Sequence, residues 1–416
     1  MGNFIIVSAV WFCFILSGLQ GQQYSTYLDA QFARPLGMVR KFIANLSGEQ
    51  SQINKIYRLN KKLGKIQPQV PQSQRFHCDA KNGPGRRSSK PPESVDEVRP
   101  GDIDIIAAIG DSLTAANGAI SNELYSLFNE NRGISFSAGG RGDWRKYLTL
   151  PNILREFNND LYGYSTEDCL SIDRASKFNV AEATTRFEDM VFQSKVLLKR
   201  MQRDPKVNMT SHWKMITVFI GSNDLCAKLC DLSTPEDLIK EHAENTYKTL
   251  RFLRQNVPRA IINWIILPNL VKLIGFKNVP TQCYIAERVE CRCIYSSRAT
   301  PETLKRYENI VTKIQQDQKE IIYQDEFNTN TFTVNLQLFG KDFSLPKLPS
   351  GDTDLRYFAS DCFHFSQLGQ AAAANALWNN IMEPEGKKLL DWMPAFKQFE
   401  CPTNERPYIA TRTNSK

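Results

Sequence analysis

DIIAAIGDSL, residues 104–113, decides the fold, because an apolar run ends at Gly110 and the polar residues Asp111 and Ser112 follow at once. A short apolar run bounded by turn residues is typical of a strand buried on both faces of a sheet. The glycine permits a sharp turn, and Ser112 then begins the next helix, near backbone N–H groups and the positive end of the helix dipole. Taken alone, such a turn is more often a simple helix cap than an active site.

The same order of strand and helix continues along the chain, since further apolar runs alternate with segments whose apolar residues recur at helical spacing. We expect strands at 133–139, 213–220 and 260–267, and helices at 186–203, 235–255, 301–322 and 367–381. Strands that alternate with helices predict a mainly parallel sheet covered on both faces, which is a three-layer α/β/α sandwich.

Composition divides the chain into a signal peptide at 1–21, a polar N-terminal extension and linker at 22–100, an α/β domain at 101–400 and a C-terminal tail at 401–416. The apolar run near the N-terminus is too short for a membrane span, and no later apolar run approaches the required length of about 18 residues. We therefore expect a secreted protein without a stable transmembrane anchor. A lysosome-like compartment is the alternative location.

The cysteines fit an oxidising compartment. Of the ten, Cys13 lies in the expected signal peptide, which leaves nine, so most should pair and at least one thiol is free or bonded to another chain. Two close pairs, Cys226 with Cys230 and Cys291 with Cys293, have no neighbouring histidine at ligand spacing. We expect disulfides there, and neither a metal nor a cofactor in the protein.

The formal net charge of +8 allows an anionic partner such as a phospholipid surface, although the same charge also favours solubility. The expected signal peptide and the lack of any recognition-module spacing argue against nucleic acid. Asn45 and Asn208 begin Asn-x-Ser/Thr sequons, so we expect N-glycosylation at both in a secreted chain. The oligomeric state is left open.

Two further polar clusters occupy places similar to that of Ser112. Asn223 follows the expected strand 213–220, and its amide can donate to a developing oxyanion. Asp361 stands three residues ahead of His364, close enough to hold the imidazole in one tautomer. Each cluster alone is also explained by a turn or a helix cap. Because parallel strands gather their carboxyl ends at one edge, we expect Ser112, Asn223 and His364 to converge.

These blocks resemble those of the GDSL, or SGNH, hydrolase family. The matching blocks are GDSL at 110–113, GSND at 221–224 and the D-x-x-H pair at 361–364. The resemblance implies a catalytic triad of Ser112, His364 and Asp361, with Asn223 in the oxyanion hole beside the backbone N–H of Ser112. No G-x-S-x-G motif occurs, which argues against the common α/β-hydrolase elbow.

The fourth block of the family is FSAGGRGDW at 136–144, whose glycine donates a backbone N–H to the oxyanion. Gly142 fits that role best, because it lies a few residues past the expected strand and is followed by Asp143. Gly140 is the second choice. Cys362 lies between the two residues of the D-x-x-H block, and we expect it in a structural disulfide rather than as a nucleophile.

The longer strings FSAGGRGDW, TLPNILREFN and SDCFHFSQLGQ resemble the phospholipase B branch of this family, whose membrane-bound mammalian members carry several tandem copies of the unit. The sequence contains one such unit, and we expect no hydrophobic C-terminal anchor. The resemblance implies a phospholipase B-like enzyme that cleaves acyl esters of phospholipids and lysophospholipids. The alternatives are a carbohydrate O-acetylesterase or short-chain esterase and, from another class, an inactive lipid-binding secreted protein.

Overall fold

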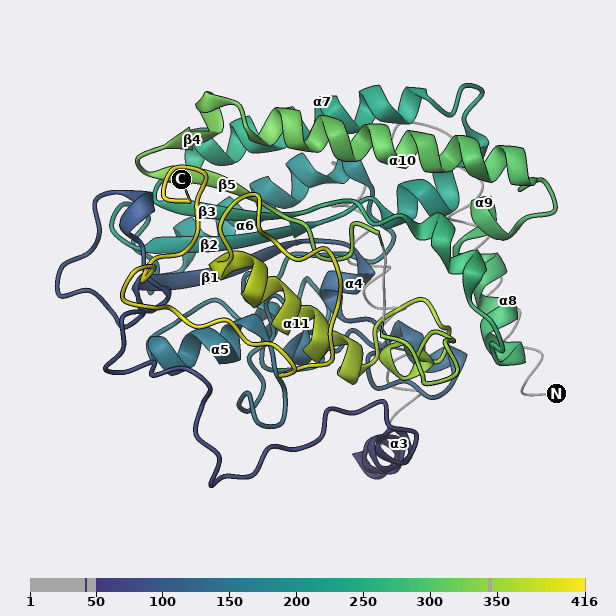
Figure 1. Cartoon of the computed structure of the whole chain (residues 1–416), viewed down its shortest axis with the longest axis horizontal. Helices are drawn as coiled ribbons and strands as arrows, with labels where there is room; N and C mark the ends of the chain where they lie inside the picture. Colours follow the sequence, from purple (N-terminus) through teal and green to yellow (C-terminus); the bar gives the residue numbers. More distant parts are fainter. Residues whose placement is uncertain (1–41, 43–49, 343–345, 416) are drawn as a thin grey trace. The chain divides into compact units, whose positions relative to one another are not determined.

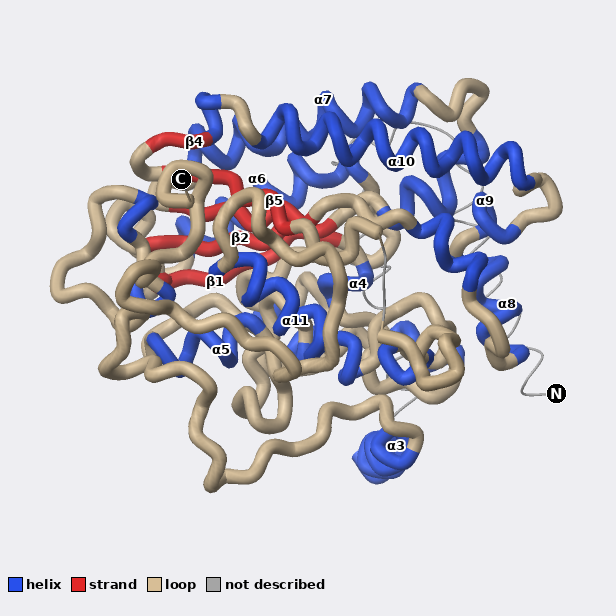
Figure 2. The backbone as a smooth tube through the Cα atoms, viewed as in Figure 1, coloured by secondary structure: helices blue, strands red, loops and turns tan. Residues whose placement is uncertain are grey.

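A mainly parallel sheet lies between two layers of helices in the computed structural model, which describes residue 42, residues 50–342 and residues 346–415 (Figures 1 and 2). Within these residues the strands are β1 Ile103–Gly110, β2 Trp213–Phe219, β3 Ala260–Ile265, β4 Asn328–Thr329 and β5 Phe332–Gln337. Their order is β1-β2-β3-β5-β4, and only β4 is antiparallel to its neighbour. The expected fold class is therefore confirmed.

The two helical layers are visible on either side of the sheet (Figure 1). One layer contains α6 Met190–Arg203, α7 Asp237–Asn256 and α10 Pro301–Ile322, and the other contains α5 Leu150–Phe157 and α11 Gln367–Met382. The other α-helices in the described residues are α3 Gln50–Lys62, α4 Ser112–Ala115, α8 Thr281–Glu290 and α9 Arg292–Tyr295. None of the helices in the described part of the chain has the length and apolar character needed to span a bilayer.

The core lies on both faces of the sheet, because every residue of β2, β3 and β5 is buried. The outer edge of β1 is covered by loop backbone rather than left open. The N–H of Ile106 donates to the carbonyl of Tyr162 at 2.9 Å, and that of Ala108 donates to the carbonyl of Phe178 at 3.0 Å. Covering an edge in this way prevents pairing with another chain.

The expected strand at 133–139 is wrong. Residues 132–134 form a single 3-10 turn. The residues that follow form hydrogen bonds with groups that belong to no strand. The N–H of Phe136 donates to the side-chain oxygen of Gln370 at 2.8 Å, and the hydroxyl of Ser135 donates to the carbonyl of Thr114 at 2.7 Å. Hydrogen bonds with distant elements replace the neighbouring strand that this apolar stretch would otherwise need.

Segments on both sides of the expected domain pack against it. The indole of Trp213 in β2 donates to the carbonyl of Pro92 at 3.0 Å, within the stretch whose composition is typical of a linker. Ile409 in the C-terminal tail is fully buried. The domain boundaries stay a prediction, and the expected signal peptide at 1–21 and the sequon at Asn45 lie outside the described residues.

Four disulfides form among the described residues, and Cys169 is the free thiol there, so the expectation of extensive pairing is confirmed. The pairs are Cys78–Cys401, Cys226–Cys291, Cys230–Cys293 and Cys283–Cys362. The first joins the N-terminal segment to the tail. The other three attach the 270–297 insertion to the loops that follow β2 and precede α11.

Candidate active site

Ser112 is presented by a sharp turn at the carboxyl end of β1. A side chain on Gly110 would collide with Thr114 and with the carbonyl of Phe219, so this close approach requires glycine. Asp111 caps α4 by accepting the N–H of Leu113 at 2.9 Å. Burial raises the pKa of the Asp111 carboxyl to about 7. The N–H of Ser112 itself is the first of the helix and has no intrahelical acceptor.

Ser112, His364 and Asp361 form one continuous chain of hydrogen bonds. The Oγ of Ser112 lies 2.8 Å from Nε2 of His364, and Nδ1 of His364 lies 2.5 Å from Oδ2 of Asp361. With its proton on Nδ1, the imidazole donates to the carboxylate and presents Nε2 as an acceptor to the serine hydroxyl. This is the geometry needed for a general base acting on a nucleophile.

The loop before α11 holds Asp361 and His364 in fixed positions. The other carboxylate oxygen of Asp361, Oδ1, accepts hydrogen bonds from the backbone N–H groups of Phe363 and His364, each at 3.1 Å. Burial raises the pKa of Asp361, but His364 and these hydrogen bonds outweigh burial and hold it below its usual range. Cys362 adopts a left-handed backbone with φ of +59°, and its disulfide to Cys283 fixes it there. The expectation that Cys362 is structural is confirmed.

Asn223 leaves the sheet at the same edge as Ser112, because Gly110 at the end of β1 is paired with Phe219 at the end of β2. One amide hydrogen of Asn223 is donated to the carbonyl of Thr185 at 2.9 Å. An amide nitrogen carries two hydrogens, so this bond orients the side chain and leaves a second donor. A place for Asn223 in an oxyanion hole stays a prediction.

The two candidate glycines of the 136–144 block differ in how their backbones are used. The N–H of Gly140 donates to the carbonyl of Ser165 at 2.7 Å, and a side chain there would collide with the ring of Tyr164. Gly142 has φ of +61°, and its N–H forms no hydrogen bond with the described residues. The unused donor favours Gly142 over Gly140 for the oxyanion hole.

A third carboxyl group, Glu290 at the end of α8, approaches the hydrogen-bonded pair of Asp361 and His364, and sequence reasoning missed it. Its Oε2 lies 3.9 Å from Nδ1 of His364. Burial raises the pKa of Glu290 well above its ordinary value, and the adjacent Asp361 carboxylate raises it further. The insertion carries no periodic signal that predicts this contact.

Glu290, Asp361 and His364 also form a group in which one ligand atom from each lies within 4.8 Å of the others. That spacing suits a metal ion. Nδ1 of His364 is already bonded to Asp361 and Nε2 to Ser112, however, so both ring nitrogens serve the hydrogen-bonded chain.

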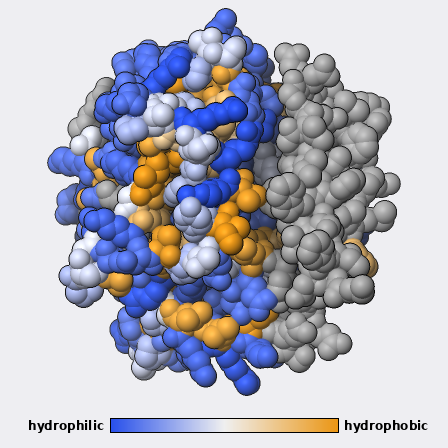
Figure 3. All heavy atoms as spheres, turned by 90° about the vertical axis from the view of Figure 1, so that its right-hand side faces the viewer, coloured by the Kyte–Doolittle hydropathy of each residue, from blue (hydrophilic) through white to orange (hydrophobic). Residues whose placement is uncertain are grey.

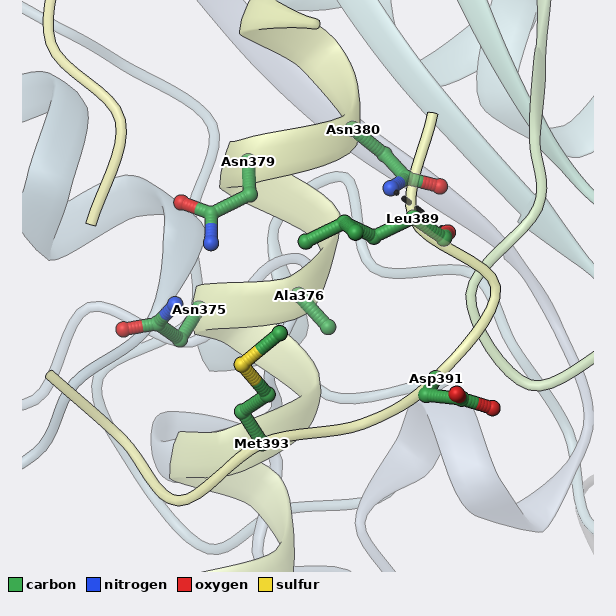
Figure 4. A pocket seen from close by; sticks show the side chains of 7 residues that line it. All are labelled: Asn375, Ala376, Asn379, Asn380, Leu389, Asp391 and Met393. Atoms are coloured by element: carbon green, nitrogen blue, oxygen red, sulfur yellow. Dashed lines mark hydrogen bonds between the residues drawn. The ribbon is translucent and has the colours of Figure 1, made fainter. Parts of the chain in front are cut away.

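A small pocket lies away from this site, between α11 and the segment 389–393 (Figure 4). The amide of Asn380 donates to the carbonyl of Leu389 at 3.1 Å, and the amides of Asn375 and Asn379 both donate to the carbonyl of Gln398. These asparagines hold the C-terminal segment against α11. Ser112, Asp361 and His364 are not among the residues that line the pocket.

The remaining predicted positions stand apart from the site. Asn208 is exposed in a turn before β2, where its side-chain oxygen accepts the N–H of Thr210 at 3.1 Å, and its glycosylation stays a prediction. His242 is buried in α7, and burial lowers its pKa to about 3.

Residues 106–377 match the family model described as GDSL-like Lipase/Acylhydrolase. The chain is 35% identical over 336 residues to human "Phospholipase B1, membrane-associated", an alignment that covers 80% of this chain and 22% of the human protein. The rat protein of the same name is 35% identical over 333 residues, with 79% and 22% covered. The chain thus spans about a fifth of the length of these curated relatives.

Proposed function

The chain belongs to the GDSL-like lipase/acylhydrolase family, and from that premise we propose that it is a serine esterase acting on the acyl esters of phospholipids and lysophospholipids. One observation carries the proposal, which is the unbroken chain of hydrogen bonds from Ser112 through His364 to Asp361. The similarity to phospholipase B1 supports lipid esters over the acetylated sugars considered from the sequence.

In the proposed mechanism, Nε2 of His364 takes the hydroxyl proton as Oγ of Ser112 attacks the ester carbonyl. Asp361 stabilises the imidazolium that forms. The oxyanion accepts hydrogen bonds from the backbone N–H groups of Ser112 and Gly142 and from the amide of Asn223. His364 then protonates the leaving alcohol, and it activates a water molecule that releases the fatty acid from Ser112.

We also propose that the protein is secreted. The four disulfides support this location, because disulfides persist in oxidising compartments. A measurement of the intact mass of the protein recovered from culture medium tests both the cleavage after residue 21 and the glycans at Asn45 and Asn208. Recovery only from the cell interior with residues 1–21 retained would contradict the proposal.

The activity is tested with a phosphatidylcholine that carries two different acyl chains. Mass spectrometry of the products identifies which ester is cut and whether the lysophospholipid is consumed in turn. We expect release of both fatty acids by the parent protein and none by Ser112→Ala. Cleavage by Ser112→Ala at the parent rate, or cleavage restricted to acetylated sugars, would refute the proposal.

A further inference from the structure

Helix α8 has its polarity reversed, with acids inside and apolar side chains outside. Glu287 is buried together with Cys283 and Ala286, and the side chain of Glu290 is only 15% exposed. On the other face, Tyr284, Ile285 and Val289 are 52%, 54% and 46% exposed. A surface helix of a globular protein normally shows the opposite arrangement. Exposed apolar residues gathered on one face indicate a binding surface.

The inner face of α8 belongs to the active site. Its last residue, Glu290, contacts the catalytic pair, and the amide of Gln282 donates to the carbonyl of Ser360 at 3.1 Å. Disulfides join Cys283 to Cys362 in the catalytic loop and Cys291, just after the helix, to Cys226. Because both ends are cross-linked, the outer face of α8 stays in one position relative to Ser112.

The outer face of α8 combines its apolar residues with positive charge. The guanidinium of Arg288 lies over the ring of Tyr284, 3.3 Å from its centroid, and Lys277 is exposed just before the helix. The acids of the helix point inward, so they do not oppose these cations at the surface. Figure 3 shows this side of the protein, which is the right-hand side of Figure 1, with apolar groups set among hydrophilic ones.

We infer that the outer face of α8 is the surface by which the protein binds an anionic phospholipid layer, with Ile285 and Val289 entering the acyl region and Arg288 contacting the phosphates. This inference rests on the proposed function, since it accounts for how the protein reaches the surface that contains its lipid ester. Apolar side chains with flanking cations are the combination that binds helices to lipid interfaces. A lipid layer bound to the outer face of α8 would lie against the same helix whose inner face contacts the loop of Asp361 and His364.

The test uses the full chain carrying Ser112→Ala, so that vesicles are bound without being hydrolysed. Ile285→Ser is compared with Ile172→Ser, an isoleucine 44% exposed in a loop that packs on α6 through a 2.9 Å bond between Ser176 and Arg200. With vesicles of phosphatidylcholine and phosphatidylserine, we expect Ile285→Ser to weaken binding about tenfold or more, because one buried isoleucine accounts for a change of that size. Ile172→Ser should bind like the parent.

A second arm keeps Ser112 in place. Here Ile285→Ser should slow hydrolysis of vesicle phospholipid and leave hydrolysis of a soluble short-chain ester unchanged. Equal vesicle binding by parent and Ile285→Ser, an equal loss in Ile172→Ser, or an equal loss on soluble ester would each overturn the inference. Sedimentation of the parent as a dimer that Ile285→Ser dissociates would overturn it too, because a second copy would then cover α8. Failure of the parent on every ester would refute the esterase proposal and leave the vesicle-binding result intact.

Discussion

Replacing Asp361 by asparagine tests the hydrogen-bonded chain at its most buried point. The carboxamide is nearly the same size as the carboxylate, and its oxygen can still accept the N–H groups of Phe363 and His364. Its NH₂ group would then face Nδ1 of His364 and favour the tautomer that carries the proton on Nε2. In that tautomer His364 cannot accept the proton of Ser112.

The size of the effect follows from the 2.5 Å contact between His364 and Asp361. Two unit charges at that separation attract each other by about 7 kcal/mol at an effective dielectric constant of about 20, which is an upper limit on the lost stabilisation of the imidazolium. Loss of the carboxylate in a serine triad lowers kcat by roughly four orders of magnitude, equivalent to about 5.5 kcal/mol. We therefore expect Asp361→Asn to lower kcat about 10⁴-fold.

The assay is steady-state hydrolysis of a soluble ester, with circular dichroism to verify folding. Asp102→Asn is the matched control, because Asp102 is also buried and accepts hydrogen bonds, from Ser88 and Arg99, at the opposite end of β1. It should change stability and leave kcat of the folded protein close to that of the parent. A folded Asp361→Asn protein that keeps more than about a tenth of the parent kcat would refute the assigned role of the carboxylate.

Three further outcomes are expected. Asn223→Ala should lower kcat by about a hundredfold or more through the loss of one oxyanion donor, and an unchanged kcat would remove Asn223 from the mechanism. Asp111→Asn keeps the helix cap but removes a carboxyl group whose pKa burial raises to about 7. In the parent, the stability that the protonated carboxyl gives is fully present below about pH 4 and is lost as the pH rises to about 7. Thermal melts should therefore show the melting temperature of the variant rising relative to that of the parent across this interval, and a constant difference would contradict this. Cys283→Ser with Cys362→Ser should lower the free energy of unfolding by about 2–5 kcal/mol and also lower kcat, whereas Cys78→Ser with Cys401→Ser should lower stability alone.

The family could be identified from the sequence because its motifs are short and local, and the match over residues 106–377 confirms the assignment. Local chemistry also explains why the helix at 301–322, α10, was predicted correctly, because Thr300 caps the helix and Pro301 follows in the first turn. The pairing of Asp361 with His364 is similarly local, since a separation of three residues on one turn brings the two side chains together.

Strand β5 was not predicted, although Phe332–Gln337 alternates apolar and polar residues, and its polar residues are buried and satisfied by distant partners. The amide of Asn335 donates to the carbonyl of Ala410 at 2.9 Å, and that of Gln337 donates to the side chain of Asn263 in β3 at 2.8 Å. In the sequence the alternation of these residues with apolar ones indicates a strand with one exposed face. Only the packed protein shows that both faces are covered.

By itself the sequence determined the alternation of strands and helices and singled out the candidate side chains for the chemistry, because hydrophobic period and turn residues act over a few positions along the chain. Tertiary structure alone decided that residues 133–139 do not pair in a sheet, which cysteines join, and that an acid from the inverted helix α8 contacts His364. These features depend on contacts between segments separated by tens to hundreds of residues. The free energy of these contacts depends on which groups the folded chain buries together, and a local sequence pattern does not contain that information.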